Sequence, residues 1–245
     1  MPHQIPLLQN MDMRNMITLR TCLRWITGLV LFVFMPPVLK AAEEPADALA
    51  TAVLAKAGIR AGVCEMPRVG DGSLAAALAR QGVAQVHALA PDAKAAEAAR
   101  QPASAGGLLG SHVIIETGTS LALPLGDWVA DLYLVADATD ANLKSMSAAE
   151  AGRVLSPYRG TAVVGNPSGT KAGLSRAALS EWAKGTAGTT TIQEDVSGLW
   201  AVVKMPPLAG GDDWSHHLHA ADGNLVLLDT AFSGVPCERQ WTGKP

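Results

Sequence analysis

Short, strongly apolar runs alternate with helix-like segments through most of this chain. The apolar runs that predict strands are 62–66, 85–89, 112–116, 131–136 and 160–165. The segments whose apolar spacing predicts helices are 43–57, 73–81, 92–101, 147–155 and 174–184. Apolar strands separated by helices are typical of a parallel sheet that is covered on both faces. Right-handed crossovers between them give a doubly wound α/β fold.

The alternation changes toward the C-terminal end of this region. Two further strand-like runs, 189–195 and 199–205, are separated only by residues 196–198, which leaves no room for a helix. Such a short turn predicts an antiparallel hairpin at one edge of the sheet. We therefore predict a Rossmann-like, doubly wound, seven-stranded and mostly parallel sheet. The hairpin comes last, and an extended C-terminal linker follows it.

An apolar run preceded by arginines predicts a signal peptide in residues 1–42. Arg14, Arg20 and Arg24 precede the apolar run 25–35. The run is shorter than the roughly 20 residues that a membrane-spanning helix needs, as expected of the apolar part of a signal peptide. We expect export to the periplasm or the extracellular space, with membrane contact only through an uncleaved signal. A buried amphipathic helix is the alternative.

Composition and charge exclude one class of partner. The hydrophobic fraction of 49% indicates a packed core, and the formal net charge of -3 offers no basic surface for nucleic acid. Cys64 lies in a strand pattern and is expected to be a small buried residue. A disulfide between Cys64 and Cys237 remains open. The run 212–219, DDWSHHLH, lacks the helical spacing of a common zinc site, so no metal site is predicted.

Several stretches between residues 58 and 205 resemble the class I S-adenosylmethionine-dependent methyltransferases. They are VCEMPRVGDGSLAAALA, VHALAPDAKAAEAAR, LPLGDWVADLYLVAD and AAEAGRVLSPYRGTAVVG. The C-terminal part, 206–245, resembles the linker and first propeller strand of secreted bacterial proteins. In those proteins a methyltransferase-like domain precedes a β-propeller of the pyrroloquinoline-quinone type. The resemblance implies a methyltransferase-like domain at 58–205 and a β-propeller domain downstream in a longer protein.

The resemblance also implies a site for S-adenosylmethionine, which begins with a glycine-rich turn after the first strand. Gly70 and Gly72 match this turn, and Glu65 stands where the family has an acidic residue. The first glycine of the family, however, falls at Pro67 or Arg68. Proline removes a donor and fixes φ, so it does not replace a glycine that allows close approach to a ligand.

Two further positions of that implied site are altered. The carboxylate that would bind both ribose hydroxyls falls at Ala90, with Asp92 two residues further on. Asp92 is either a shifted ribose ligand or the start of the following helix. Gly118 and Thr119 stand where the family has an acid-bearing turn that contacts adenine. Asp137 and the pair 166–167 lie at plausible rim positions, but we expect them to be ordinary surface loop residues.

These changes favour a methyltransferase-like domain with a degenerate cofactor site, as the N-terminal module of an exported quinoprotein-like protein. One alternative is an active methyltransferase in which Glu65, Gly70, Gly72 and Asp92 hold the cofactor in a shifted geometry. Another is a non-catalytic interaction or scaffold module whose cleft binds a different small molecule or nothing. The residues predict no catalytic group.

Overall fold

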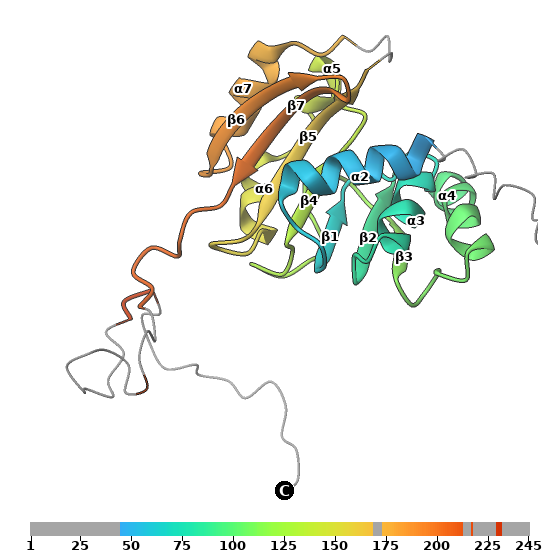
Figure 1. Ribbon diagram of the computed structural model, residues 1–245, viewed down its shortest axis with the longest axis horizontal. Coiled ribbons are helices and arrows are strands. Elements are labelled where there is room, and N and C mark those ends of the chain that lie inside the picture. Colours follow the sequence, from blue (N-terminus) through green and yellow to red (C-terminus); the bar gives the residue numbers. More distant parts are fainter. Residues whose placement is uncertain (1–44, 169–172, 213–216, 218–228, 232–245) are drawn as a thin grey trace, which may run out of the picture. The chain divides into compact units, whose positions relative to one another are not determined.

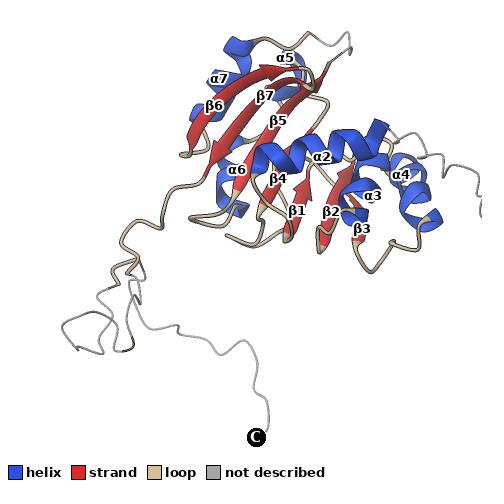
Figure 2. Ribbon diagram, in the orientation of Figure 1, coloured by secondary structure: helices blue, strands red, loops and turns tan. Residues whose placement is uncertain are grey.

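A single sheet of seven strands forms the framework of the domain (Figures 1 and 2). The computed structural model describes residues 45–168, 173–212, 217 and 229–231. The strands are β1 (Val63–Met66), β2 (Gln85–Ala90), β3 (Val113–Thr117), β4 (Leu132–Val135), β5 (Thr161–Pro167), β6 (Thr189–Asp195) and β7 (Gly198–Lys204). Their order is β3-β2-β1-β4-β5-β7-β6. Strands β1 to β5 are parallel, whereas β7 is antiparallel to both β5 and β6. The predicted fold class, including the hairpin, is confirmed.

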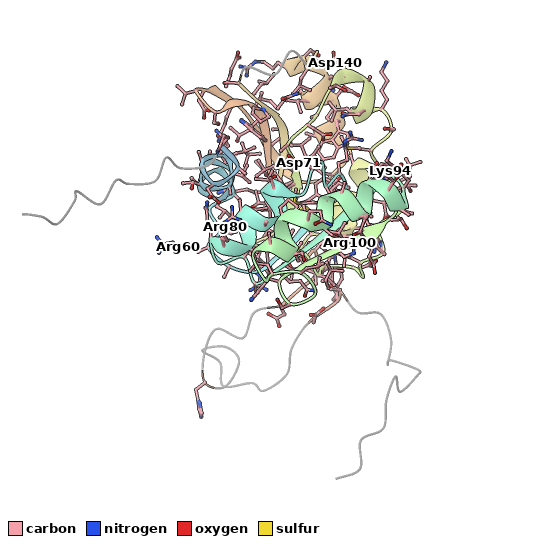
Figure 3. The ribbon with its side chains drawn as sticks, turned by 90° about the vertical axis from the view of Figure 1, so that its right-hand side faces the viewer. Arg60, Asp71, Arg80, Lys94, Arg100 and Asp140 are labelled. Carbon is pink, nitrogen blue, oxygen red and sulfur yellow. The ribbon has the colours of Figure 1, made fainter. Side chains whose placement is uncertain are left out.

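Helices cover both faces of this sheet. They are α2 (Pro45–Ala57), α3 (Ser73–Arg80), α4 (Ala93–Ala105), α5 (Asp140–Leu143), α6 (Ala148–Val154) and α7 (Arg176–Lys184). One core cluster joins α2, α3 and α4 to one face, and a second joins α5, α6 and α7 to the other. In Figure 1, α2 crosses in front of the strands. Figure 3 views the layer of α3 and α4 with Arg80, Lys94 and Arg100 labelled.

The central strands are apolar on both sides because each face has its own core. Leu132 and Leu134 of β4 belong to the first cluster, whereas Tyr133 and Val135 belong to the second. Successive side chains of a strand point to opposite faces, so a strand between two helical layers reads as a continuous apolar run. This is the pattern from which the strands were predicted.

The sequence predicts that helix α4 ends before Pro102. In the structure, α4 continues through Pro102 to Ala105. Proline removes one hydrogen bond from a helix. Here the packing outweighs that loss, because Ala99 and Ala103 both lie fully buried in the first core cluster. The N–H of Gly106 then donates to the carbonyl of Pro102 at 3.3 Å and closes the last turn.

The connection from β3 to β4, residues 118–131, contains no helix. Arg153 of α6 holds this segment by donating to the carbonyls of Leu123 and Leu125 at 3.1 and 2.9 Å. Glu150 accepts from the N–H of Leu123 at 2.9 Å and pairs with Arg153 at 2.8 Å. These contacts lower the pKa of Glu150 to about 2. Two charged residues of α6 therefore organise a segment that has no regular structure of its own.

Some sequence predictions fall outside the part of the chain that the structure describes. They include the signal at 1–42, Cys237 and most of the segment 213–245. None of the helices within the described residues is long and apolar enough to cross a membrane.

The turn after β1 provides a matched test of the packing between α3 and α4. Gly70 and Gly72 both have positive φ, 63° and 82°. A Cβ on Gly72 would lie 1.9 Å from the carbonyl oxygen of Ala99, whereas one on Gly70 would meet nothing within 4 Å. We expect Gly70→Ala to cost about 1 kcal/mol in the free energy of unfolding. Gly72→Ala should cost about 3 kcal/mol or more, because backbone atoms must move. Urea denaturation measures both, and equal costs would contradict this account.

Candidate functional site

A cavity of about 440 Å³ opens at the carboxyl ends of the first four strands. Its walls come from the segment 67–70 after β1, from Leu89 and Pro91 at the end of β2, from 118–121 after β3, and from Asp137 after β4. The chain passes outward from β1 to β2 and β3 on one side, and from β4 to β5 on the other. Open α/β sheets bind ligands at the point where the strand order reverses in this way.

Three of the six predicted cofactor residues line this cavity. They are Gly70, Gly118 and Thr119. The amide of Gly118 donates to the carbonyl of Ala90 at 2.9 Å, which ties the loop after β3 to the end of β2. Val69, next to Gly70, likewise donates to the carbonyl of Leu89 at 2.9 Å. The loops that line the cavity are thus joined to the end of β2 by backbone hydrogen bonds.

The other three predicted residues have roles within the fold. Asp92 caps helix α4, because its carboxylate accepts from the N–H of Ala95 at 2.8 Å. Gly72 is the N-cap residue of α3 and lies against the backbone of α4. Glu65 is fully buried within β1. Their assignment to a cofactor stays a prediction, but each already has a structural reason for its identity.

The position expected to carry the ribose carboxylate does not face the cavity. Ala90 has no exposed surface and belongs to the first core cluster, on the side of α3 and α4. The residue that lines the cavity at this point is its neighbour Pro91. A carboxylate at position 90 would therefore be buried in an apolar core, where it carries a large desolvation cost.

An ion pair joins the two sides of the cavity. Arg68, after β1, donates from Nε to both carboxylate oxygens of Asp137 at 2.9 Å, and from Nη2 to Oδ2 at 2.6 Å. These hydrogen bonds raise the pKa of Arg68. The side chains are 37% and 46% exposed, and pairs so exposed stabilise a fold by only about 0.2–1 kcal/mol. The main effect of the pair is to place two charged side chains at the cavity wall.

The sequence pointed to both members of this pair without joining them. Arg68 stands where the resemblance places a glycine, and Asp137 stands at a predicted rim position. The signal that could have found the pair is that opposite charges follow the ends of two neighbouring parallel strands, β1 and β4. Only the register between those strands makes the contact certain.

A row of ionisable side chains runs across the sheet beneath the cavity. The Nδ1 of His87 lies 2.6 Å from Oε2 of Glu65, and its Nε2 lies 3.4 Å from Oε2 of Glu116. Within β2, His87 precedes the cavity residue Leu89 by two positions, so both lie on the same face of the strand. Glu65 is the register partner of His87 on β1. Burial raises the pKa of Glu65, and the bond from Glu65 raises the pKa of His87.

Two other expectations concern residues near the site. Asn166 was expected to be a surface loop residue, but it is buried in β5 and its Nδ2 donates to the carbonyl of Ala138 at 2.9 Å. Cys64 is buried, as expected; its thiol is free in the structure, and burial raises its pKa. Among the described residues, no group of three or more ligating side chains could hold a metal ion.

No protein-family model and no curated protein sequence matches this chain. Solved structures do match it. Geranyl diphosphate C-methyltransferase from Streptomyces coelicolor A3(2) matches with a TM-score of 0.53 and 13% identity, over 69% of this chain and 84% of that one. The PH0226 protein of Pyrococcus horikoshii OT3 matches with a TM-score of 0.52 and 16% identity, over 64% and 87% of the two chains. The domain has the class I methyltransferase fold.

A third match bears on what that fold implies. The [4+2]-cyclase SpnF matches with a TM-score of 0.51 and 18% identity, over 63% of this chain and 63% of the cyclase. The present chain thus spans less than two thirds of that protein. Because a protein named as a cyclase shares the methyltransferase fold, the fold alone does not specify methyl transfer.

The row of Glu65 and His87 should make stability depend on pH. Both pKa values are raised, so the folded protein keeps its protons to higher pH than the unfolded chain does. The contribution of His87 is fully present below its ordinary pKa of 6.5 and is lost as the pH rises through the raised value. We expect the free energy of unfolding to fall as the pH rises from about 6.5 through the raised pKa of His87. His87→Gln should flatten this decline, whereas the control His112→Gln should not. If the free energy of unfolding declined equally with pH in the unaltered protein and in both variants, the assignment to His87 would be wrong.

Proposed function

We propose that this domain is a binding or interaction module with the methyltransferase fold, and that its crevice holds S-adenosylmethionine weakly or not at all. The Arg68–Asp137 pair is the observation that carries this proposal. The pair lies at the wall of the cavity where the fold would place a cofactor. Its arginine belongs to the turn after β1, which is rich in glycine in the family that the sequence resembles. The chain accordingly has the architecture of a methyltransferase without the recognition groups of one.

The turn after β1 supports this proposal. A cofactor that approaches backbone amides needs residues without large side chains at that point. Here Pro67 supplies no N–H, and Arg68 directs a long side chain toward Asp137. Gly70 alone of the two matching glycines lines the cavity.

The end of β2 supports it as well. The cavity there is lined by Pro91, whose side chain carries no acceptor for ribose hydroxyls. The nearby carboxylate of Asp92 caps α4. Each charge-assisted hydrogen bond that is missing costs about 1.5–3 kcal/mol, which is a factor of about ten or more in affinity.

An active methyltransferase remains the second candidate, because Gly70, Gly118 and Thr119 all line one cavity of about 440 Å³. In that case the cofactor would share the cavity with the Arg68–Asp137 pair. The two candidates differ in one measurable quantity, the affinity for S-adenosylmethionine.

Calorimetric titration with S-adenosylmethionine and S-adenosylhomocysteine tests the proposal. We expect no saturable binding below about 1 mM. The variant Pro91→Asp with Thr119→Asp should gain affinity by about tenfold or more, because it adds two acceptors at the cavity. The matched variant Pro91→Asn with Thr119→Asn, of similar shape but uncharged, should gain much less. Micromolar binding by the unaltered protein would reject the proposal and favour the methyltransferase.

We further propose, from the sequence, that residues 1–42 direct export and that the natural protein continues into a β-propeller. The arginines before the apolar run 25–35 support the first part, and the likeness of 206–245 to a propeller linker supports the second. Residues 1–42 fused to a phosphatase that is active only after export should give active enzyme. Leu31→Arg, which interrupts the apolar run, should abolish that activity. An inactive fusion with the unaltered segment would contradict export.

A further inference from the structure

The wall of the cavity combines one pair of opposite charges with apolar side chains. Among the described residues that line it, only Arg68 and Asp137 are charged. Leu89, Pro91 and Leu121 belong to the apolar part of the wall. Leu121 is 61% exposed, so a ligand that covered it would remove apolar surface from water. These features favour a ligand that carries charge at one end and an apolar group at the other.

The charged pair keeps hydrogen-bonding capacity for a ligand. Arg68 bonds to the carboxylate of Asp137 through Nε and Nη2 alone. A guanidinium has more N–H donors, and a carboxylate more acceptor sites, than these bonds use. The two side chains are 37% and 46% exposed, so both can be reached from solvent. A ligand can therefore bond to Arg68 and to Asp137 while the pair stays intact.

The short distance between the two charges limits which ligand can contact both. The Nη2 of Arg68 and the Oδ2 of Asp137 are 2.6 Å apart, so the charged groups of the ligand must also be close together. In an α-amino acid, two bonds separate the ammonium nitrogen from the carboxylate carbon, a distance of about 2.5 Å. A ligand with a single charge is attracted by one member of the pair and repelled by the other.

We infer that the cavity binds a free α-amino acid with an apolar side chain. The carboxylate of the ligand accepts hydrogen bonds from Arg68, its ammonium group donates to Asp137, and its side chain lies against the apolar wall at Leu121. A volume of about 440 Å³ is at the lower end of the range for small-molecule sites, as suits so small a ligand. None of the residues that the resemblance assigns to S-adenosylmethionine belongs to the pair. The inference rests on the proposed function and names the ligand class of the module.

Calorimetric titration of the full chain with L-leucine tests this inference. We expect saturable binding with a Kd below about 1 mM. Glycine lacks the apolar side chain and should bind at least about tenfold more weakly. Arg68→Gln and Asp137→Asn should each weaken leucine binding by about tenfold or more, because each removes charge-assisted hydrogen bonds. The control Arg176→Gln, in the exposed pair with Glu194 at 3.0 Å, should leave the affinity unchanged.

Two analogues of leucine assign each charge of the ligand to its partner. Leucinamide lacks the carboxylate and N-acetyl-leucine lacks the ammonium group, so both should bind more weakly than leucine. Arg68→Gln should not weaken leucinamide binding further, and Asp137→Asn should not weaken N-acetyl-leucine binding further, because the interaction in question is already missing. The pair is well exposed, so both variants should keep the urea midpoint of the unaltered protein. Equal losses for every ligand would contradict the inference.

The outcomes separate this inference from the proposed function. Micromolar binding of S-adenosylmethionine would reject the proposed function, and this inference with it. If S-adenosylmethionine does not bind, the absence of saturable leucine binding overturns this inference alone. Leucine binding that neither Arg68→Gln nor Asp137→Asn weakens would place the ligand elsewhere and would overturn it equally.

Discussion

The reversal of strand order between β1 and β4 is the constraint on which the rest of the domain depends. Crossovers from these two neighbouring strands run to opposite faces of the sheet, so their loops separate and leave a cavity at the carboxyl ends. In this protein a charged pair, Arg68 and Asp137, closes part of that gap. The pair contributes little stability, because both side chains are well exposed. It places two opposite charges at the cavity wall.

The sheet also holds a buried carboxylate, which lies against an imidazole. Glu65 lies fully buried and bonds to His87 on the neighbouring strand. A lone carboxylate in that place would carry a heavy desolvation cost, and the imidazole reduces it. Glu65 therefore looks in the sequence like the acidic residue of a cofactor motif, while in the fold it is part of a row of side chains below the cavity.

The connection between β3 and β4 is held by polar contacts rather than by regular structure. It has no helix, and the Arg153–Glu150 pair of α6 holds its carbonyl and amide groups instead. Such a connection depends on a few polar contacts, whereas the helices of the opposite face depend on extended apolar packing. The irregular segment also supplies Ser120 and Leu121 to the cavity wall.

Local sequence was sufficient for the elements and the class of fold. Apolar strands such as β4 are buried on both faces, and the short turn at 196–198 admits only a hairpin, so these features follow from periodicity and chain length. The course of α4 through Pro102 did not follow, because burial of Ala103 against the sheet outweighs the local preference. The contacts of the site were likewise decided by tertiary structure. Arg68 meets Asp137, Asp92 caps a helix and Ala90 turns into the core. The reason is physical: side-chain direction and strand register depend on neighbours that are distant in the chain.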